Sequence, residues 1–195
     1  MGSVNRPRDF LEDEVLDRAL MAFWRLGYEA CSITQLVKYT GVQRQSLYNS
    51  FGDKDGLFLA VLKRYEAHSA AELAALRTPE ATLSDVRRYM ERVLGIQSAR
   101  GCGACLLVQT AYGTQIRNAR VRRVVMSGAS AVRAGFVGAI ERAVRRGELP
   151  ERTHVEQYAA YLYAVLNGLS ALRRTGGSDE QVAAVLNQVF PNSAI

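Results

Sequence analysis

The segment from Ser32 to Phe51 constrains the fold of this chain more than any other part of the sequence, because it carries two short helix signals around one glycine. Ser32 and Gln35 have the spacing of a capping box, so a helix is predicted to begin directly after Ser32. Gly41 can adopt a positive φ without a Cβ clash, which lets the chain turn and restart a helix at about Gln43. The pattern is typical of a helix-turn-helix.

The second helix of this pair presents a polar face without negative charge. Leu47 and Phe51 repeat the spacing of buried positions, so the other side chains of this helix are predicted to face outward. A helix that lies in the major groove of DNA needs hydrogen-bond donors and acceptors on its outer face. The outward residues that supply them are Arg44, Gln45, Ser46, Tyr48 and Asn49. The segment is therefore predicted to bind double-stranded DNA.

Helical spacing of apolar residues continues along nearly the whole chain. Of the 195 residues, 48% are hydrophobic and only four are proline. No strand-like alternation persists, so the sequence predicts an all-α protein of about nine helices. The expected helices cover residues 11–26, 33–40, 43–51, 54–68, 83–98, 104–112, 119–146, 153–174 and 179–190.

The formal net charge of +6 gives little support to DNA binding by itself. Residues 1–66 hold nine basic and nine acidic side chains, so the whole excess lies in residues 67–195. The placement of the charges is more informative than their sum. The acidic residues of the first part gather between Asp9 and Asp17 and leave the two short helices clear.

The sequence predicts a cytoplasmic protein that does not cross a membrane. No stretch reaches the roughly 20 apolar residues of a membrane span, and the N-terminus lacks the apolar core of a signal peptide. Cys31, Cys102 and Cys105 are too few for a disulfide scaffold.

Cys102 and Cys105 have CxxC spacing just before an expected helix, whose free amides favour a thiolate over a thiol. Two interpretations stay open: a redox pair, or a buried small residue at Cys105 beside an incidental thiol at Cys102. No metal site is expected, because one CxxC supplies two ligands and His68 and His154 lie far away in the sequence. No cofactor and no catalytic site are expected, since neither βαβ patterning, a nucleophile elbow nor a phosphate loop is present.

The last two expected helices carry an apolar stripe that is wide for a surface helix. One interpretation is ordinary core, and the other is that the stripes of two subunits pack as a symmetric four-helix interface. The residues assigned to such an interface are Tyr158, Leu162, Val165, Leu169, Leu172, Val185 and Val189.

The N-terminal part of the chain resembles the TetR family of transcriptional regulators over about its first 65 residues. The matching positions are Val15, Leu16, Ala19, Phe23, Gly27, Tyr28, Ser32, Ile33, Leu36, Gly41, Val42, Leu47, Tyr48, Phe51, Gly52, Lys54, Leu57 and Phe58. The remaining two thirds resemble the family in helix order. Residues 103–111 also look like a segment of one branch that reads glycine-cysteine, apolar residues, asparagine, threonine or serine, and alanine. There Cys105 matches the branch cysteine, whereas Cys102 departs from the pattern.

The resemblance implies a homodimer in which each subunit has three parts. These are a helix-turn-helix DNA-binding domain over residues 1–52, a connecting helix over residues 53–68, and a larger helical domain over residues 69–195 that dimerises and binds a small-molecule effector. The DNA contacts that it implies fall on Thr34, Gln43, Arg44, Gln45, Ser46, Tyr48, Asn49 and Lys54.

The function expected from the resemblance is a ligand-responsive regulator, most simply a repressor, that leaves a palindromic operator when an effector binds. Residues that could line an effector pocket, each of which could equally be core, are Tyr89, Val108, Tyr112, Met126, Phe136 and Tyr163. Some members of the resembled branch sense electrophiles or oxidants through a cysteine, so a thiol-sensing repressor using Cys105, with or without Cys102, is an alternative. A helical scaffold that binds proteins but no DNA is another.

Overall fold

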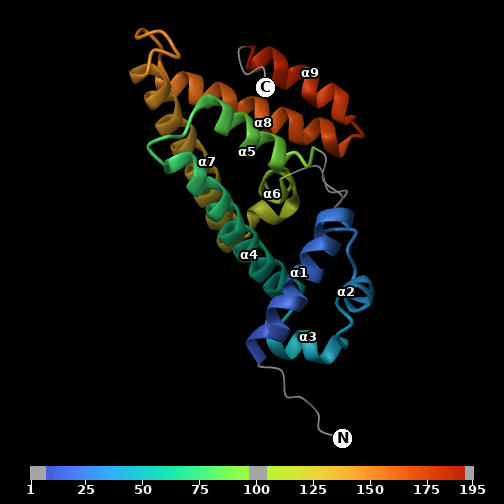
Figure 1. The fold of residues 1–195 in the computed structure, drawn as a ribbon. Helices are drawn as coiled ribbons and strands as arrows, with labels where there is room; N and C mark the ends of the chain where they lie inside the picture. Colours follow the sequence, from blue (N-terminus) through green and yellow to red (C-terminus); the bar gives the residue numbers. More distant parts are fainter. Residues whose placement is uncertain (1–7, 97–104, 192–195) are drawn as a thin grey trace, which may run out of the picture.

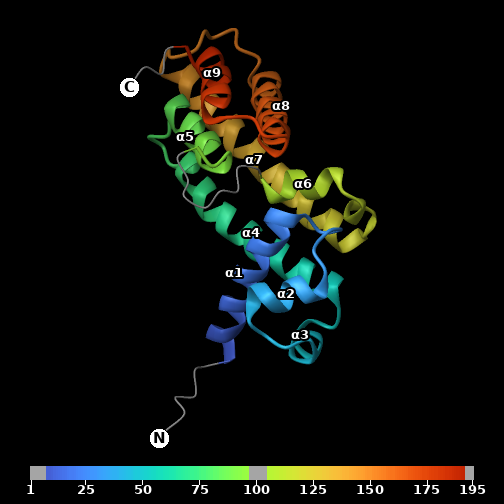
Figure 2. The same ribbon diagram turned by 90° about the vertical axis from the view of Figure 1, so that its right-hand side faces the viewer.

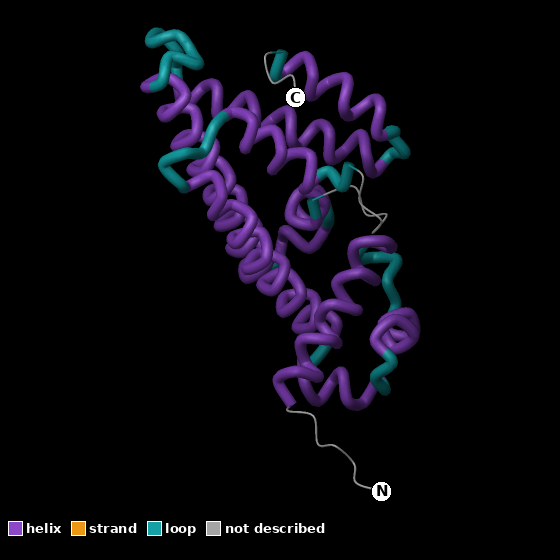
Figure 3. The backbone as a smooth tube through the Cα atoms, in the orientation of Figure 1, coloured by secondary structure: helices purple, strands orange, loops and turns teal. Residues whose placement is uncertain are grey.

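The computed structural model describes residues 8–96 and 105–191. Over these two ranges the chain forms nine α-helices and two short 3-10 helices and contains no strand. Figures 1 and 3 show how the helices are arranged. The all-α prediction is confirmed. The helices are α1 (Arg8–Leu26), α2 (Ile33–Thr40), α3 (Arg44–Phe51), α4 (Lys54–Ala74), η1 (Ala75–Arg77), α5 (Leu83–Val93), α6 (Leu106–Tyr112), η2 (Thr114–Arg117), α7 (Ala119–Arg145), α8 (Val155–Arg174) and α9 (Asp179–Val189).

The three N-terminal helices form a small unit at one end of the molecule, which we call the head (α1, α2 and α3; Figure 1). Its core is made by apolar residues of α1, α2 and α3 that pack on the first half of α4. Buried residues of α6 and α7 belong to the same core, so the head packs directly against the larger domain. Buried members include Leu16, Phe23, Leu36, Leu47, Leu57, Phe58, Val61, Leu106 and Val121.

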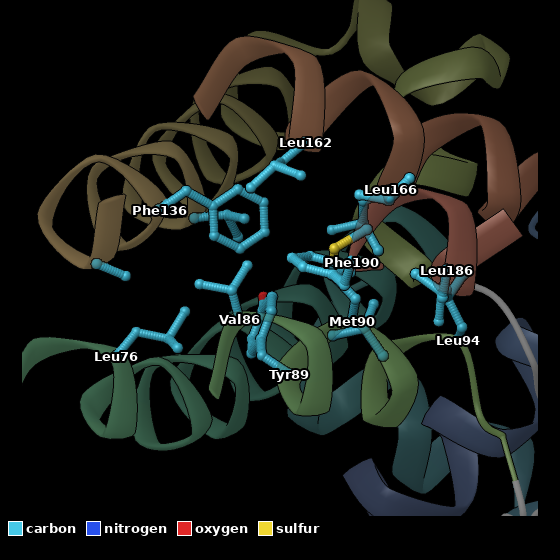
Figure 4. Packing of buried hydrophobic residues seen from close by; sticks show 14 of the residues in the cluster. Leu76, Val86, Tyr89, Met90, Leu94, Phe136, Leu162, Leu166, Leu186 and Phe190 are labelled. Atoms are coloured by element: carbon cyan, nitrogen blue, oxygen red, sulfur yellow. The ribbon is translucent and has the colours of Figure 1, made fainter. Parts of the chain in front are cut away.

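The second core lies at the other end of α4, among α5, α7, α8 and α9. Figure 4 shows Tyr89, Phe136 and Leu162 directed into the space between these helices. The rings of Tyr89 and Phe136 meet edge to face with their centroids 5.9 Å apart. Leu73 near the end of α4 belongs to this core, while Leu57 near its start belongs to the core of the head. A single helix therefore spans both cores.

Two helix boundaries differ from the sequence-based expectation by five residues or more, and the others differ by at most three. Helix α4 continues to Ala74 instead of ending near residue 68, because no helix breaker precedes Thr78 and Pro79 and the intervening residues are good helix formers. Helix α5 ends at Val93, shortly before Gly95 turns the chain with φ +68°. The expected continuation to residue 98 extends beyond the described residues.

Helix α7 is the longest helix of the described chain. Its length and hydropathy would suffice to cross a membrane, yet 44% of its most apolar window is buried inside the protein. It packs against both α4 and α8. Packing between these helices accounts for its apolar face.

Candidate nucleic-acid interface

The predicted capping box starts the helix-turn-helix. The Ser32 hydroxyl accepts a hydrogen bond from the Gln35 amide at 3.2 Å, and the Gln35 side chain accepts one from the Ser32 amide at 2.7 Å. Two amides that the first turn of a helix leaves without backbone partners are thereby satisfied. The start of α2 is thus fixed by residues within four positions of one another, which is why the sequence alone could predict it.

The turn between α2 and α3 is held by three kinds of contact. Gly41 adopts φ +73° and donates its amide to the Val37 carbonyl at 2.9 Å. The Thr40 hydroxyl donates to the Leu36 carbonyl at 2.7 Å and accepts from the Val42 amide. Arg18 of α1 donates to the Thr40 carbonyl at 3.1 Å. These bonds tie the turn to α1 and set the direction in which α3 leaves it.

Helix α3 buries one side and exposes the predicted polar face. Leu47 is 2% exposed, whereas Arg44, Gln45, Ser46 and Asn49 are exposed. The polar groups are partly ordered among themselves: the Arg44 guanidinium lies 5.2 Å from the centre of the Tyr48 ring, and the Gln45 amide donates to Asn49 at 3.0 Å. Neither α2 nor α3 contains a carboxylate. The face therefore offers donors, acceptors and positive charge to a DNA groove.

The acidic residues that follow α3 are occupied by contacts inside the protein. Asp53 caps α4 and accepts from the Gly56 amide at 2.7 Å. Asp55 accepts a hydrogen bond from the Tyr28 hydroxyl. Lys54 lies between them in sequence, and its ammonium sits 4.1 Å above the centre of the Tyr28 ring.

Tyr28 is a residue whose role sequence reasoning missed. Its ring packs on Phe23 and Phe58 of the head core and also contacts the Lys54 ammonium. Burial, and then the bond to Asp55, raises the pKa of the Tyr28 hydroxyl, so the group stays neutral. The signal available in the sequence was only that an aromatic residue follows the glycine after α1.

An ion-pair network joins α4 to α1. Arg64 donates to Asp13 at 2.6 Å and to both oxygens of Asp17 at 2.6 and 2.8 Å, and the Arg64 side chain is only 20% exposed. Two carboxylates on successive turns of α1 thus hold one guanidinium of α4. Two carboxylates of the acidic cluster that precedes the helix-turn-helix in the sequence therefore hold α1 against α4.

Family models match both halves of the chain. The model of the bacterial regulatory proteins of the tetR family matches residues 15–61, and the model of the tetracyclin repressor-like C-terminal domain matches residues 81–189. The chain belongs to the TetR family. Both the resemblance and the fold expected from it are confirmed.

Curated relatives of this TetR-family chain are transcriptional regulators. It is 28% identical over 198 residues to the HTH-type transcriptional repressor ComR of Escherichia coli, which covers 97% of this chain and 93% of the relative. It is 30% identical over 162 residues to YezE of Bacillus subtilis, an uncharacterised HTH-type transcriptional regulator. This match covers 82% of this chain and 84% of the relative.

Solved TetR-family structures have the same fold. A cysteine mutant of the regulator CifR, complexed with a 26-base-pair double-stranded operator, is 27% identical with a TM-score of 0.77, and the match covers 97% of this chain and all of that one. A regulator from Agrobacterium tumefaciens shares the fold at 20% identity, with a TM-score of 0.82 and coverage of 94% and 97%. This protein is a DNA-binding transcriptional regulator and not an enzyme, as the sequence predicted.

The six residues predicted to line an effector pocket do not surround one cavity. Tyr89 and Phe136 are buried against each other in the second core. Tyr112 and Met126 are 77% and 63% exposed, so the prediction that these two line an enclosed cavity is wrong. Both lie on the outer sides of their helices, where helical spacing alone does not separate core from surface. A cleft of about 600 Å³ between α1, α4 and the end of α5 is lined by none of the six.

The Cys105 thiol lies between the two cores, directly before α6. It accepts a hydrogen bond from the Tyr65 hydroxyl at 3.5 Å. Burial raises the pKa of Cys105 above its ordinary value, although the Tyr65 hydroxyl and two amides of α6 act in the opposite direction. The expected bias toward a thiolate is therefore wrong for Cys105, since desolvation outweighs the helix terminus. Cys102 lies outside the described residues.

Three residues assigned to a subunit interface are part of the subunit's own core. Leu162, Leu169 and Val189 are at most 8% exposed in the single chain. They face α5, α7 and their neighbouring helix, so assigning them to a second subunit is wrong. Tyr158, Val165 and Leu172 are half-buried at the edge of this core, and Val185 is 39% exposed.

The outer face of α8 and α9 carries small and apolar side chains. Tyr161 is 50% exposed, and its ring stacks on that of Tyr158 with centroids 6.0 Å apart. The other exposed positions with small or apolar side chains on the two helices are Ala160, Ala164, Gly168, Ala171, Ala184 and Val185. We call these residues, with Tyr161, the small-residue face. Sequence analysis assigned Val185 to a subunit interface but did not assign the other residues of this face, because a helix with apolar residues on two sides shows no single stripe.

Proposed function

We propose that this protein is a homodimeric repressor that binds an approximately palindromic operator in the cytoplasm and leaves it when a small-molecule effector binds. The observation that carries this proposal is the outward face of α3, which is free of carboxylates and rests on one buried leucine. The naming of several relatives as repressors and the operator-bound CifR complex support it.

Within this proposal, two α3 helices enter successive major grooves of one duplex. Gln43, Arg44, Gln45, Ser46 and Asn49 meet base edges or nearby phosphates. A bidentate contact from the Arg44 guanidinium to guanine would discriminate against other bases by about 1–3 kcal/mol. Thr34, Tyr48 and Lys54 contact the backbone and fix the register of the recognition helix.

The test is to sequence the genomic fragments that the purified protein retains at a stated salt concentration, and to measure affinity for the recovered site. The double substitution Arg44→Ala and Tyr48→Ala should abolish specific retention. A matched control carries Arg120→Ala and Tyr112→Ala, which remove the same residue types from exposed positions on α7 and α6. Equal retention by the first variant and its parent would contradict the proposal and favour the scaffold hypothesis.

The small-residue face is the proposed contact with a second subunit. Alanine and glycine at exposed positions of α8 allow the backbones of two helices to approach closely, and a twofold axis would pair the face with its own copy. Tyr158, Val165, Leu172 and Val185 border this contact. Ala164→Glu should convert the dimer to lone protomers in solution scattering, while Ala134→Glu at an exposed position of α7 should not. Lone protomers of the unaltered chain at micromolar concentration would contradict it.

The proposed effector site lies among α5 to α8, with Tyr89, Val108, Phe136 and Tyr163 as its candidates. An effector can release DNA only if it binds the arrangement that cannot bind DNA more tightly. The coupling is reciprocal, so operator DNA must weaken effector binding by the same factor by which the effector weakens operator binding. A compound that stabilises the protein against heat and leaves operator affinity unchanged is not the effector.

Thiol sensing through Cys105 is a second candidate, favoured by the contact between its sulfur and the Tyr65 hydroxyl. Oxidation or alkylation there would place a larger group between the two cores. Cys105→Ser should then abolish release of operator DNA by an oxidant, and Cys102→Ser distinguishes a one-cysteine from a two-cysteine response. Unchanged release from Cys105→Ser would contradict thiol sensing.

A further inference from the structure

A cavity of about 320 Å³ lies where the head meets the larger domain. Figure 2 shows α6 beside the C-terminal end of α1, and the cavity lies in this region. Leu26 and Tyr28 give it partly exposed apolar surface, whereas Phe23, Phe58 and Leu106 also line it but are at most 2% exposed. The volume falls in the range of small-molecule sites, at the lower end.

Arg174 of α8 brings a positive charge to this cavity. Its guanidinium donates to the Gln109 side chain at 2.8 Å and lies against the backbone of Gly27. A Cβ atom at Gly27 would be 3.0 Å from an Arg174 nitrogen, and Gly27 has φ +77°. Because Gly27 has no Cβ atom, the Arg174 guanidinium can occupy this position at the cavity.

The charge of Arg174 is not neutralised within the described chain. No carboxylate of the described residues lies within ion-pair distance of its guanidinium, and its hydrogen bond goes to a neutral amide. Glu29 also lines the cavity, but its carboxylate accepts from the Thr114 hydroxyl. A guanidinium has five N–H donors in a fork that matches a carboxylate.

We propose that this cavity binds a small monocarboxylate with an apolar body about the size of one ring. The carboxylate pairs with Arg174, and the body lies against Leu26 and Tyr28. Apolar walls with one anchoring charge are what a ligand of this kind requires, because its ring gains from burial and its charge from a bidentate pair. The site is separate from the effector site proposed among α5 to α8.

Such a ligand would connect the loop after α1 to both α6 and α8. It would therefore favour one orientation of the head relative to the larger domain. This regulatory consequence rests on the proposed function, whereas binding itself does not.

The test uses three probes with the same ring: benzoate, benzyl alcohol and benzylamine. Each is titrated into the full-length ¹⁵N-labelled protein without DNA, and amide shifts are followed by NMR. Benzoate should give saturable shifts at Gly27, Glu29 and Gly113, and should bind at least about tenfold more tightly than benzyl alcohol, because the charged hydrogen bonds are lost with the alcohol. Tighter binding of benzylamine would identify Glu29 as the anchor and overturn the proposal, as would shifts confined to other residues.

Arg174→Met removes the charge but keeps an unbranched apolar side chain, and should weaken benzoate binding about tenfold or more. Arg120→Met on exposed α7 is the matched control and should bind like the parent. Arg174→Lys, which keeps the charge and loses the fork, should lie between them. Equal benzoate affinity in the parent and Arg174→Met overturns the site.

Operator binding is measured separately on the same samples. Failure to bind benzoate with normal operator binding refutes only the cavity, and benzoate binding without any retained DNA refutes only the proposed function.

Discussion

Lys54, the first residue of α4, offers a quantitative test of the proposed contact with a DNA phosphate. If each protomer places one lysine on the DNA backbone, Lys54→Met removes two contacts from the dimer. Each lost phosphate contact lowers the slope of log affinity against log salt by about 0.9, so the slope should fall by about 1.8. Between 50 and 200 mM salt, the parent should then lose roughly 12-fold more affinity than the variant.

The Tyr28 ring makes a second, different prediction for the same lysine. A cation held over an aromatic ring at a partly exposed site is favoured by about 0.5–1 kcal/mol. Tyr28→Leu removes this support but keeps the charge, so DNA binding must supply that free energy in both protomers. Operator affinity should fall about 5- to 30-fold with an unchanged salt slope.

Fluorescence anisotropy with a labelled operator, repeated at several salt concentrations, separates the two effects. Lys63→Met, on an exposed position of the same helix, controls for loss of general positive charge. Tyr28→Phe keeps the ring and should bind nearly as the parent does. A parental salt slope in Lys54→Met would show that this lysine contacts no phosphate, and unchanged affinity in Tyr28→Leu would show that the ring does not position it.

Three further predictions concern stability and reactivity. Ser32→Ala should lower the free energy of unfolding by about 0.5–2 kcal/mol in urea denaturation, and no change would mean that the capping box contributes nothing. Phe136→Ala should lower the free energy of unfolding by about 3–5 kcal/mol, whereas Met126→Ala on the surface should change it by no more than about 0.5 kcal/mol. Similar losses in the two variants would contradict the assigned core. Because burial raises the pKa of Cys105, a smaller fraction of it is thiolate at pH 8 than of a free thiol. Iodoacetamide should therefore modify Cys105 more slowly than it modifies glutathione, which peptide mass mapping can measure. Faster modification of Cys105 would refute the assigned burial.

The helix-turn-helix was predictable because its determinants are local. Ser32 and Gln35 are three positions apart, and Gly41 needs only its own freedom at φ. Leu47 could be assigned to the core from helical spacing alone. The polar outer face of α3 could then be assigned as the side of the helix opposite Leu47.

Contacts between distant segments could not be predicted in this way. Tyr28 contacts Lys54 across 26 positions in the sequence, and Arg174 lies close to Gly27 across 147 positions. The apolar stripe of α8 was visible in the sequence, but not which side of it faces the subunit's own core. Leu162 and Ala164 lie two positions apart, and only packing shows that the first is buried and the second exposed.

The continuity of α4 has a mechanical consequence. Its 21 residues span about 31 Å from the cap at Asp53 to the second core. A rotation of 5° about one end of such a rod would displace the other end by about 3 Å. Because Arg64 binds α1 to α4, the head would move together with α4 as a rigid body. A tilt of α4 too small to disturb the packing around Leu73 would then produce a larger displacement at α3.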